Sequence, residues 1–279
     1  MRAQILRYPV DIWAALLVVG LFSAQLATYL YVENPWVRAA IVVGLLPLHV
    51  SATAYNHNHI HVLTFVPRPL NRIFELMLFF ETGSSPFSGT LNHIVGHHAT
   101  YFQPPEDTLN WRRPDGSTMG HGEFALKKAL GHYSSCFAIG KRNKGLFMQF
   151  LIHSTLGVAI LAALVVYRPL AASTVFVFPM AVMLFALKWA AYAHHRGLPI
   201  GDDRTASRTH TGRFYNILTW NAGYHAAHHF KQALHWSRLP AYHATLALPE
   251  ELQGPRWGAA AAAGFGRAAG AGATVRRTS

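Results

Sequence analysis

The chain has 279 residues, of which 51% are hydrophobic and only 13% are charged. An ordinary soluble protein carries about 25% charged residues, so this composition predicts residence in a membrane. The single cysteine, Cys136, excludes an internal disulfide and any metal site built from several thiolates. A bound metal would therefore have to rely on nitrogen and oxygen ligands.

Lysine and arginine together number 24, against 12 aspartates and glutamates. In a soluble protein this balance would favour nucleic-acid binding. Here the basic residues follow the predicted membrane spans, and we expect no nucleic-acid partner. The chain also holds 18 histidines, an excess that needs a chemical reason.

Four apolar segments are long enough to cross a bilayer, which takes about 20 residues. In chain order they cover residues 10–32, 37–55, 145–167 and 170–193. The turn ENPW joins the first pair, and Arg168 with Pro169 separates the second pair. The four spans are therefore expected to form two hairpins.

A shorter apolar segment, Leu70 to Phe80, lies between the hairpins and contains Arg72 and Glu75. It is too short to span, and its amphipathic character predicts an interfacial helix in the headgroup plane. A buried helix within a soluble cap is the alternative.

Two hairpins leave the N-terminus, residues 56–144 and everything after His194 on one side of the membrane. Of the 24 basic residues, only Arg38 and Arg168 then lie on the opposite side. The positive-inside rule makes the basic side cytoplasmic, with both termini there. The expected fold is an all-α integral membrane protein of four transmembrane helices with a cytosolic helical cap. Residues 1–253 form one catalytic domain, and the Ala/Gly/Arg-rich tail 254–279 is expected to be disordered.

Three histidine clusters fall in the predicted cytoplasmic segments. They are His57 and His61; His93, His97 and His98; and His225, His228 and His229. Residues three or four apart share a helix face, so each cluster can direct several imidazoles to one point. Imidazole suits iron, zinc, copper and nickel, and eight ligands exceed what one ion takes. The clusters therefore predict a site for two metal ions on the cytoplasmic side.

The order HxxxH, HxxxHH, hairpin, HxxHH resembles the membrane-bound fatty acid desaturase and hydroxylase superfamily. The resemblance covers residues 10–245, and the contexts NAGYHAAHH and LHWSRLP are similar to those of bacterial members. It implies two irons held almost wholly by histidine, with molecular oxygen as co-substrate and a fatty acyl or other long alkyl chain as substrate. A bacterial inner membrane is the expected location.

The resemblance also implies one further histidine ligand near the end of the fourth span. His194 is preferred there to its neighbour His195. Some relatives carry an asparagine one helical turn earlier that holds a water on iron. This chain has Ala190 at that position, and Asn221 is the candidate to replace it.

Four residues are candidates to contact the ligand rings on the side away from the metal and so orient them: His59, Asp107, Asn221 and His235. Carboxylates and other acceptors commonly orient metal-bound imidazoles in this way. For His59 the simpler alternative is a solvated side chain, because it lies on a different helical face from His57 and His61.

Desaturation is the favoured reaction because the HxxHH context resembles desaturases more closely than hydroxylases. Hydroxylation of an alkyl or lipid substrate by the same centre is the alternative. His49 and His153, which lie inside predicted spans, leave a metal- or haem-binding membrane protein without oxygenase activity as a third option. The chain has neither an HPGG motif nor a cysteine quartet, so a separate ferredoxin- or cytochrome-type donor with its reductase is expected to supply electrons.

Overall fold

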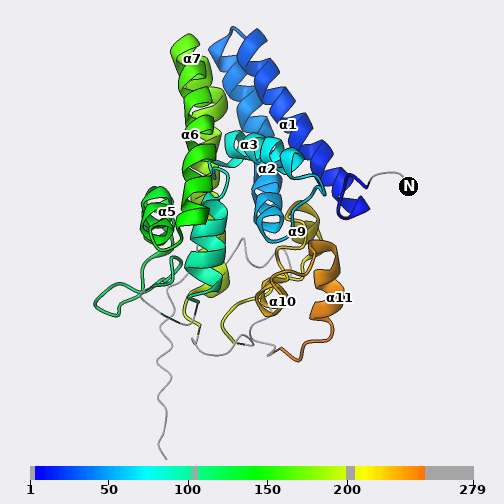
Figure 1. Ribbon diagram of the computed structural model, residues 1–279, viewed down its shortest axis with the longest axis vertical. Helices are drawn as coiled ribbons and strands as arrows, with labels where there is room; N and C mark the ends of the chain where they lie inside the picture. The colour runs from blue at the N-terminus through cyan, green and yellow to red at the C-terminus, as the bar shows by residue number, and fades with distance from the viewer. Residues whose placement is uncertain (1–3, 102, 104–105, 199–204, 249–279) are drawn as a thin grey trace, which may run out of the picture.

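Four long apolar helical segments organise the chain in the computed structural model, which describes residues 4–101, 103, 106–198 and 205–248 (Figure 1). Each is long and apolar enough to cross a membrane, as predicted. They are α1 (Ile12–Tyr31), preceded by the 3-10 turn η1 (Pro9–Asp11); α2 (Pro35–His61); α6 (Lys144–Tyr167); and α7 (Pro169–Ala172), η3 (Ser173–Val177) and α8 (Phe178–His195) in sequence. The predicted tail 254–279 lies outside the described residues.

The second and fourth spans run further than their hydropathy predicts. α2 continues to His61 and α8 continues to His195, so both carry histidine rings beyond their apolar parts. A helix can extend past its apolar stretch where its backbone hydrogen bonds persist and its side chains find packing partners. These extensions place the first histidine cluster and the His194–His195 pair on rigid helices.

The two hairpin turns lie together at one end of the long helices. Arg168 donates to the carbonyls of Tyr29 and Leu30, at 2.6 and 2.7 Å, and pairs with Glu33 at 2.7 Å. This arginine satisfies carbonyls that the end of α1 leaves free. It thereby ties the two hairpins together.

The fourth span is interrupted by the π-helical turn η3, which disturbs the regular backbone pairing. Gln25 of α1 is buried and donates its Nε2 to the carbonyl of Val175 within this turn, at 2.9 Å. A neighbouring helix thus supplies a hydrogen bond where an irregular helix needs one.

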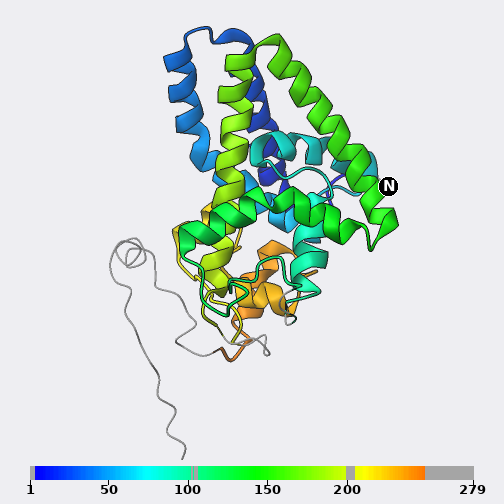
Figure 2. The same ribbon diagram turned by 90° about the vertical axis from the view of Figure 1, so that its left-hand side faces the viewer.

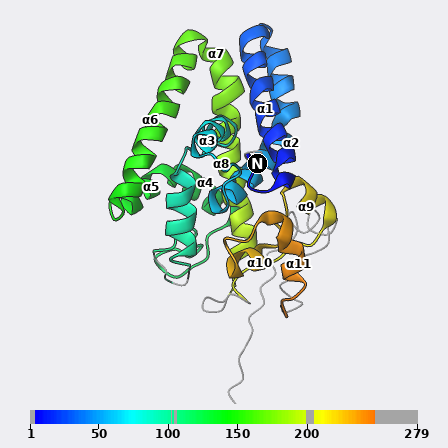
Figure 3. The same ribbon diagram turned by 45° about the vertical axis from the view of Figure 1, so that its right-hand side comes forward.

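Helix α3 (Arg68–Thr82) crosses between the two hairpins, as Figure 3 shows. Phe74, Leu78, Phe79 and Phe80 are all buried, and α3 contacts α1, α2, α6 and α8. Gly157 of α6 permits this approach, because a Cβ there would lie 2.9 Å from the Phe79 ring. Helix α3 therefore packs against both hairpins, while Leu70 and Ile73 near its start are exposed. Its place in the headgroup plane stays a prediction.

Shorter helices gather at the end of the bundle where α2 and α8 finish (Figures 1 and 2). They are the π-helix η2 (Thr90–His98), α4 (His121–Leu130), α5 (His132–Gly140), α9 (Arg213–Leu218), α10 (His225–Phe230), the 3-10 turn η4 (Trp236–Arg238) and α11 (Leu239–His243). This layer of short helices, together with its loops, is called the cap below. The remaining histidine clusters lie in it.

A buried hydrogen-bonded clasp fixes the cap to the start of the first span. Asp11 is 1% exposed and accepts from Trp236 Nε1 at 2.8 Å and from His235 Nε2 at 3.0 Å. The His235 ring also stacks on Tyr8, with centroids 3.9 Å apart. The segment that follows the third histidine cluster is therefore anchored to the first turn of the chain.

We expect Asp11→Ala to lower the thermal unfolding midpoint of the purified protein. Removing the carboxylate leaves two buried donors unpaired, at a cost of about 1–3 kcal/mol each. Asp115→Ala, which changes an exposed loop carboxylate, is the matched control. Equal midpoints for the two variants would contradict a structural role for the clasp.

Candidate metal centre

Five imidazole rings from three segments meet in a first group. His57 and His61 come from α2, His93 and His98 from η2, and His228 from α10; one nitrogen of each lies within 4.8 Å of the others. His93 Nε2 lies 2.9 Å from both His57 Nε2 and His98 Nε2. His98 Nε2 is in turn 3.0 Å from His228 Nε2.

A second group lies beside the first. His97, His195 and His229 bring one nitrogen each within 4.8 Å of one another, and all three rings are buried. His225 adjoins them, with its Nε2 2.9 Å from His195 Nε2 and 3.2 Å from His229 Nε2. The rings of all three predicted clusters, plus His195, therefore converge.

The spacing between these nitrogens fits metal ligands better than hydrogen bonds. A ring nitrogen offers either one N–H or one lone pair, so His93 and His98 would each have to share a single proton or lone pair between two neighbours. Two imidazole nitrogens about 2.0–2.1 Å from one ion and at a right angle to each other would be about 3.0 Å apart. The observed distances are those expected at the edge of a coordination shell.

The π-helix η2 decides how the middle cluster divides. Its wider turn brings His93 and His98, five residues apart, to the first group, while His97 points to the second. Gly96 within it packs tightly, since a Cβ there would lie 2.5 Å from Ile139 Cδ1 and 2.6 Å from Thr108 Cγ2. An ordinary α-helix, which the spacing alone predicts, would have paired His93 with His97.

Two side chains contact the Nδ1 atoms of rings in the second group. Asp107 Oδ1 lies 2.8 Å from His97 Nδ1 and also accepts from the Leu109 amide. This contact makes Nδ1 the protonated nitrogen of His97 and leaves its buried Nε2, which has no other partner among the described residues, facing the group. Tyr101, which sequence reasoning missed, places its hydroxyl 3.0 Å from His195 Nδ1.

The other three candidate supporting residues make their contacts elsewhere. His59 is buried against Thr64 and Glu75, at 2.8 and 3.3 Å. Asn221 donates to the carbonyl of Trp236, and His235 belongs to the Asp11 clasp. Of the four, only Asp107 contacts a clustered ring through the interactions described here.

His195, rather than His194, enters the second group. His194 Nδ1 instead lies 2.9 Å from the carbonyl of Arg208, and its ring stacks on His225 with centroids 4.1 Å apart. With His195 in this place, the residue one helical turn earlier is Ala191, which has no polar group, just as Ala190 has none.

The two histidines within the spans bind backbone carbonyls. His49 Nδ1 lies 2.8 Å from Glu81 O, and His153 Nδ1 lies 2.8 Å from Gln149 O in its own helix. Such contacts are typical of packing histidines. They give no indication of a shared haem.

Four of the cap rings are held in the uncharged form. Burial lowers the pKa of His93, His225, His228 and His229 well below the ordinary value, and the neighbouring rings lower it further. Neutral imidazole has the lone pair that a metal ion requires. The electrostatics of the cap thus agree with its geometry.

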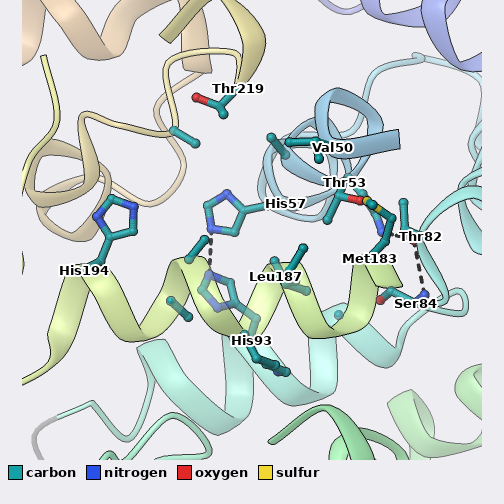
Figure 4. Close-up of a pocket in the computed structure, with 18 of the residues that line it drawn as sticks. Val50, Thr53, His57, Thr82, Ser84, His93, Met183, Leu187, His194 and Thr219 are labelled. Carbon is teal, nitrogen blue, oxygen red and sulfur yellow. Dashed lines mark hydrogen bonds between the residues drawn. The ribbon is translucent and has the colours of Figure 1, made fainter. Parts of the chain in front are cut away.

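A cavity of about 200 Å³ adjoins the rings, between α2 and α8. Figure 4 shows His57 and His93 facing each other beside it, with His194 toward one end and Thr82 and Ser84 toward the other. His195 and His225 also line it, and much of the remaining wall is apolar, including Val50, Met183 and Leu187. An apolar molecule in this cavity would lie against both groups.

Comparison with known proteins agrees with this geometry. A family model described as fatty acid desaturase matches residues 34–258, which is most of the chain. The chain belongs to the fatty acid desaturase family. No curated protein matches the chain significantly.

Membership of the fatty acid desaturase family agrees with the four apolar helices and the histidine groups of this protein. It supports a membrane oxidoreductase that acts on lipid or acyl substrates. The histidine groups are compatible with the metal-dependent catalysis of the family. The matched region includes every histidine of the two groups.

We expect His195→Ala to reduce the metal content of the purified protein, while His194→Ala retains it. The physical reason is that only His195 presents a nitrogen to the second group. Elemental analysis of the two variants, purified identically, provides the measurement. The reverse outcome would restore His194 as the ligand.

Asp107→Ala should weaken metal binding roughly 10–100-fold, the effect typical of losing a carboxylate that orients a ligand histidine. Metal retained against a series of chelator concentrations provides the measurement. Glu106→Ala, at the exposed neighbouring residue, is the control. If both variants lose metal equally, the Asp107–His97 contact does not orient the ring.

Proposed function

We propose that this protein uses two irons and molecular oxygen to desaturate a fatty acyl or other long alkyl chain. The observation that carries the proposal is the convergence of nine buried or half-buried imidazoles, in two adjoining groups, at the wall of a largely apolar cavity. Family membership supports the same class of reaction. When bound, the irons would supply the redox chemistry with which oxygen attacks an unactivated carbon–hydrogen bond.

The proposed ligand sets follow the two groups. One iron is held by His57, His61, His93, His98 and His228, and the other by His97, His195, His225 and His229. Imidazole is a suitable ligand for iron. Among the described residues no carboxylate belongs to either group, so the centre is proposed to be all-histidine.

The other residues of the proposed site orient the ligand rings and exclude water from the cavity. Asp107 and Tyr101 fix the rings of His97 and His195. The apolar wall, including Val50 and Leu187, would hold a methylene chain against the histidine rings and keep water away from the reacting carbon.

Electrons must enter from outside, because desaturation consumes oxygen, two substrate hydrogens, two further electrons and two protons to form two waters. We propose a separate ferredoxin- or cytochrome-type donor that docks on the cap. The positive-inside rule supports placing the cap in the cytoplasm, since the predicted cap side carries 21 of the 24 basic residues, all except Arg38, Arg168 and Lys188, which lies within the fourth span.

Product analysis tests the reaction. The protein is co-expressed with a ferredoxin and its reductase, and the cell lipids are profiled by mass spectrometry. An acyl product lighter by two hydrogens is expected. A product heavier by one oxygen would instead establish hydroxylation, and unchanged lipids together with an iron-free protein would refute the proposal.

Substitution of single ligands in the first histidine group should abolish the desaturated product. His93→Ala, His98→Ala and His228→Ala each remove one ring from the first group, and we expect each variant to lose both activity and iron. His153→Ala, which removes a ring that contacts Gln149 O and Phe87 and belongs to neither histidine group, is the matched control. Full turnover by the His228 variant would exclude the third cluster from the metal site.

A further inference from the structure

A buried lysine lies in the wall of the cavity. Lys188 of α8 is 4% exposed and lines the cavity beside apolar residues of the same helix, among them Leu187 and Ala191. Its Nζ donates to Asn92 Oδ1 at 2.6 Å. Within the part of the chain that the structure describes, no carboxylate is paired with this amino group.

An amino group in such a position is costly to bury. A charged or strongly polar group removed from water requires compensation by hydrogen bonds or by a partner charge. Lys188 has three N–H donors, of which the contact with Asn92 uses one. Ionisable residues inside a membrane-spanning helix commonly mark a functional site.

A second buried polar side chain lines the same cavity. His132 of α5 is 2% exposed, and its Nε2 lies 3.2 Å from Ser88 Oγ. Its buried Nδ1 has no hydrogen-bond partner among the described residues. Burial and the neighbouring charge of Lys188 hold the pKa of this imidazole well below its ordinary value.

Lys188, Asn92 and His132 therefore form a polar wall contributed by three different elements, α8, η2 and α5. All three residues are at least nine-tenths buried and line the cavity. Lys188 retains two unused N–H donors. Ser88 Oγ donates to Ser85 O, so His132 Nε2 donates to Ser88 and the free Nδ1 of His132 is an acceptor. A ligand that fits Lys188 must therefore present an acceptor atom.

This polar wall is close to the metal groups. Asn92 immediately precedes His93, a member of the first group. Lys188 precedes His195 by seven residues, which is two turns on the same helix face and about 10 Å along the axis. An oxygen bound at Lys188 would lie in the cavity that the rings of His93 and His195 also line.

We propose that Lys188, oriented by Asn92, binds a carboxylate or carbonyl oxygen of the substrate. Lys188 thereby selects an oxygen-bearing alkyl chain over a plain hydrocarbon. This inference rests on the proposed function and adds a specificity-determining residue.

Ligand binding to the full-length, iron-loaded protein provides the test, with decanoate, methyl decanoate and decane as probes. Affinities are obtained from the rise of the unfolding midpoint with ligand concentration. Wild-type protein should bind decanoate more tightly than decane. Lys188→Met should reduce decanoate affinity roughly ten- to hundredfold, the loss expected for a hydrogen bond to a charged group, and leave decane affinity and iron content unchanged.

The matched control is Lys128→Met, because Lys128 lies over the Phe124 ring and does not line the cavity. Lys188→Gln, which keeps a neutral N–H donor at this position, gives a second variant, for which a smaller loss of decanoate affinity is expected. Methyl decanoate distinguishes the two oxygen sources. If it binds as tightly as decanoate, Lys188 recognises a carbonyl oxygen. If it binds as weakly as decane, Lys188 recognises a carboxylate.

Two results would overturn the inference. One is equal wild-type affinity for decanoate and decane. The other is a Lys188→Met variant that loses iron or loses affinity for all three probes alike, which would make the lysine a support for His93 through Asn92. The proposed function is judged separately, since iron content and lipid product are measured on wild-type protein whatever the probes show.

Discussion

The crowding of uncharged ring nitrogens in a water-poor interior is the constraint on which the rest of this structure depends. At His93 and His98 each nitrogen faces two others at about 3 Å, an arrangement that hydrogen bonds satisfy poorly and a cation satisfies well. The extended ends of α2 and α8, the wide turn of η2 and the anchored cap all serve this convergence. A metal ion bound by these rings would therefore also stabilise the cap.

The general architecture could be predicted from local patterns in the sequence. The four spans were predictable because each depends on the hydropathy of about 20 consecutive residues. The three clusters were recognisable because close spacing, as in His225, His228 and His229, places rings on one helix face. Asp107 was a reasonable candidate because acidic residues near ligand histidines commonly orient them, and it contacts His97.

The remaining features depend on contacts between distant segments. His194 and His195 differ by about 100° around the helix axis, and the packing of α8 in the bundle decides which of them faces the other rings. Assigning His97 to the second group required the π-helical turn, which residue spacing does not encode. Lys188 was visible as a charged residue inside the predicted fourth span. Its surroundings were not, because its partner Asn92 is 96 residues away and α2, α5, η2 and α8 build its cavity jointly.

The clasp between Asp11 and His235 has a consequence for biosynthesis. The two residues are 224 positions apart, and chains emerge from the ribosome N-terminus first. Both spans of the first hairpin can insert before His235, the partner of Asp11, has been synthesised. His225, His228 and His229 are also synthesised only near the end of translation. Both groups of rings are therefore complete only late in translation, because each includes a histidine of the segment 225–229.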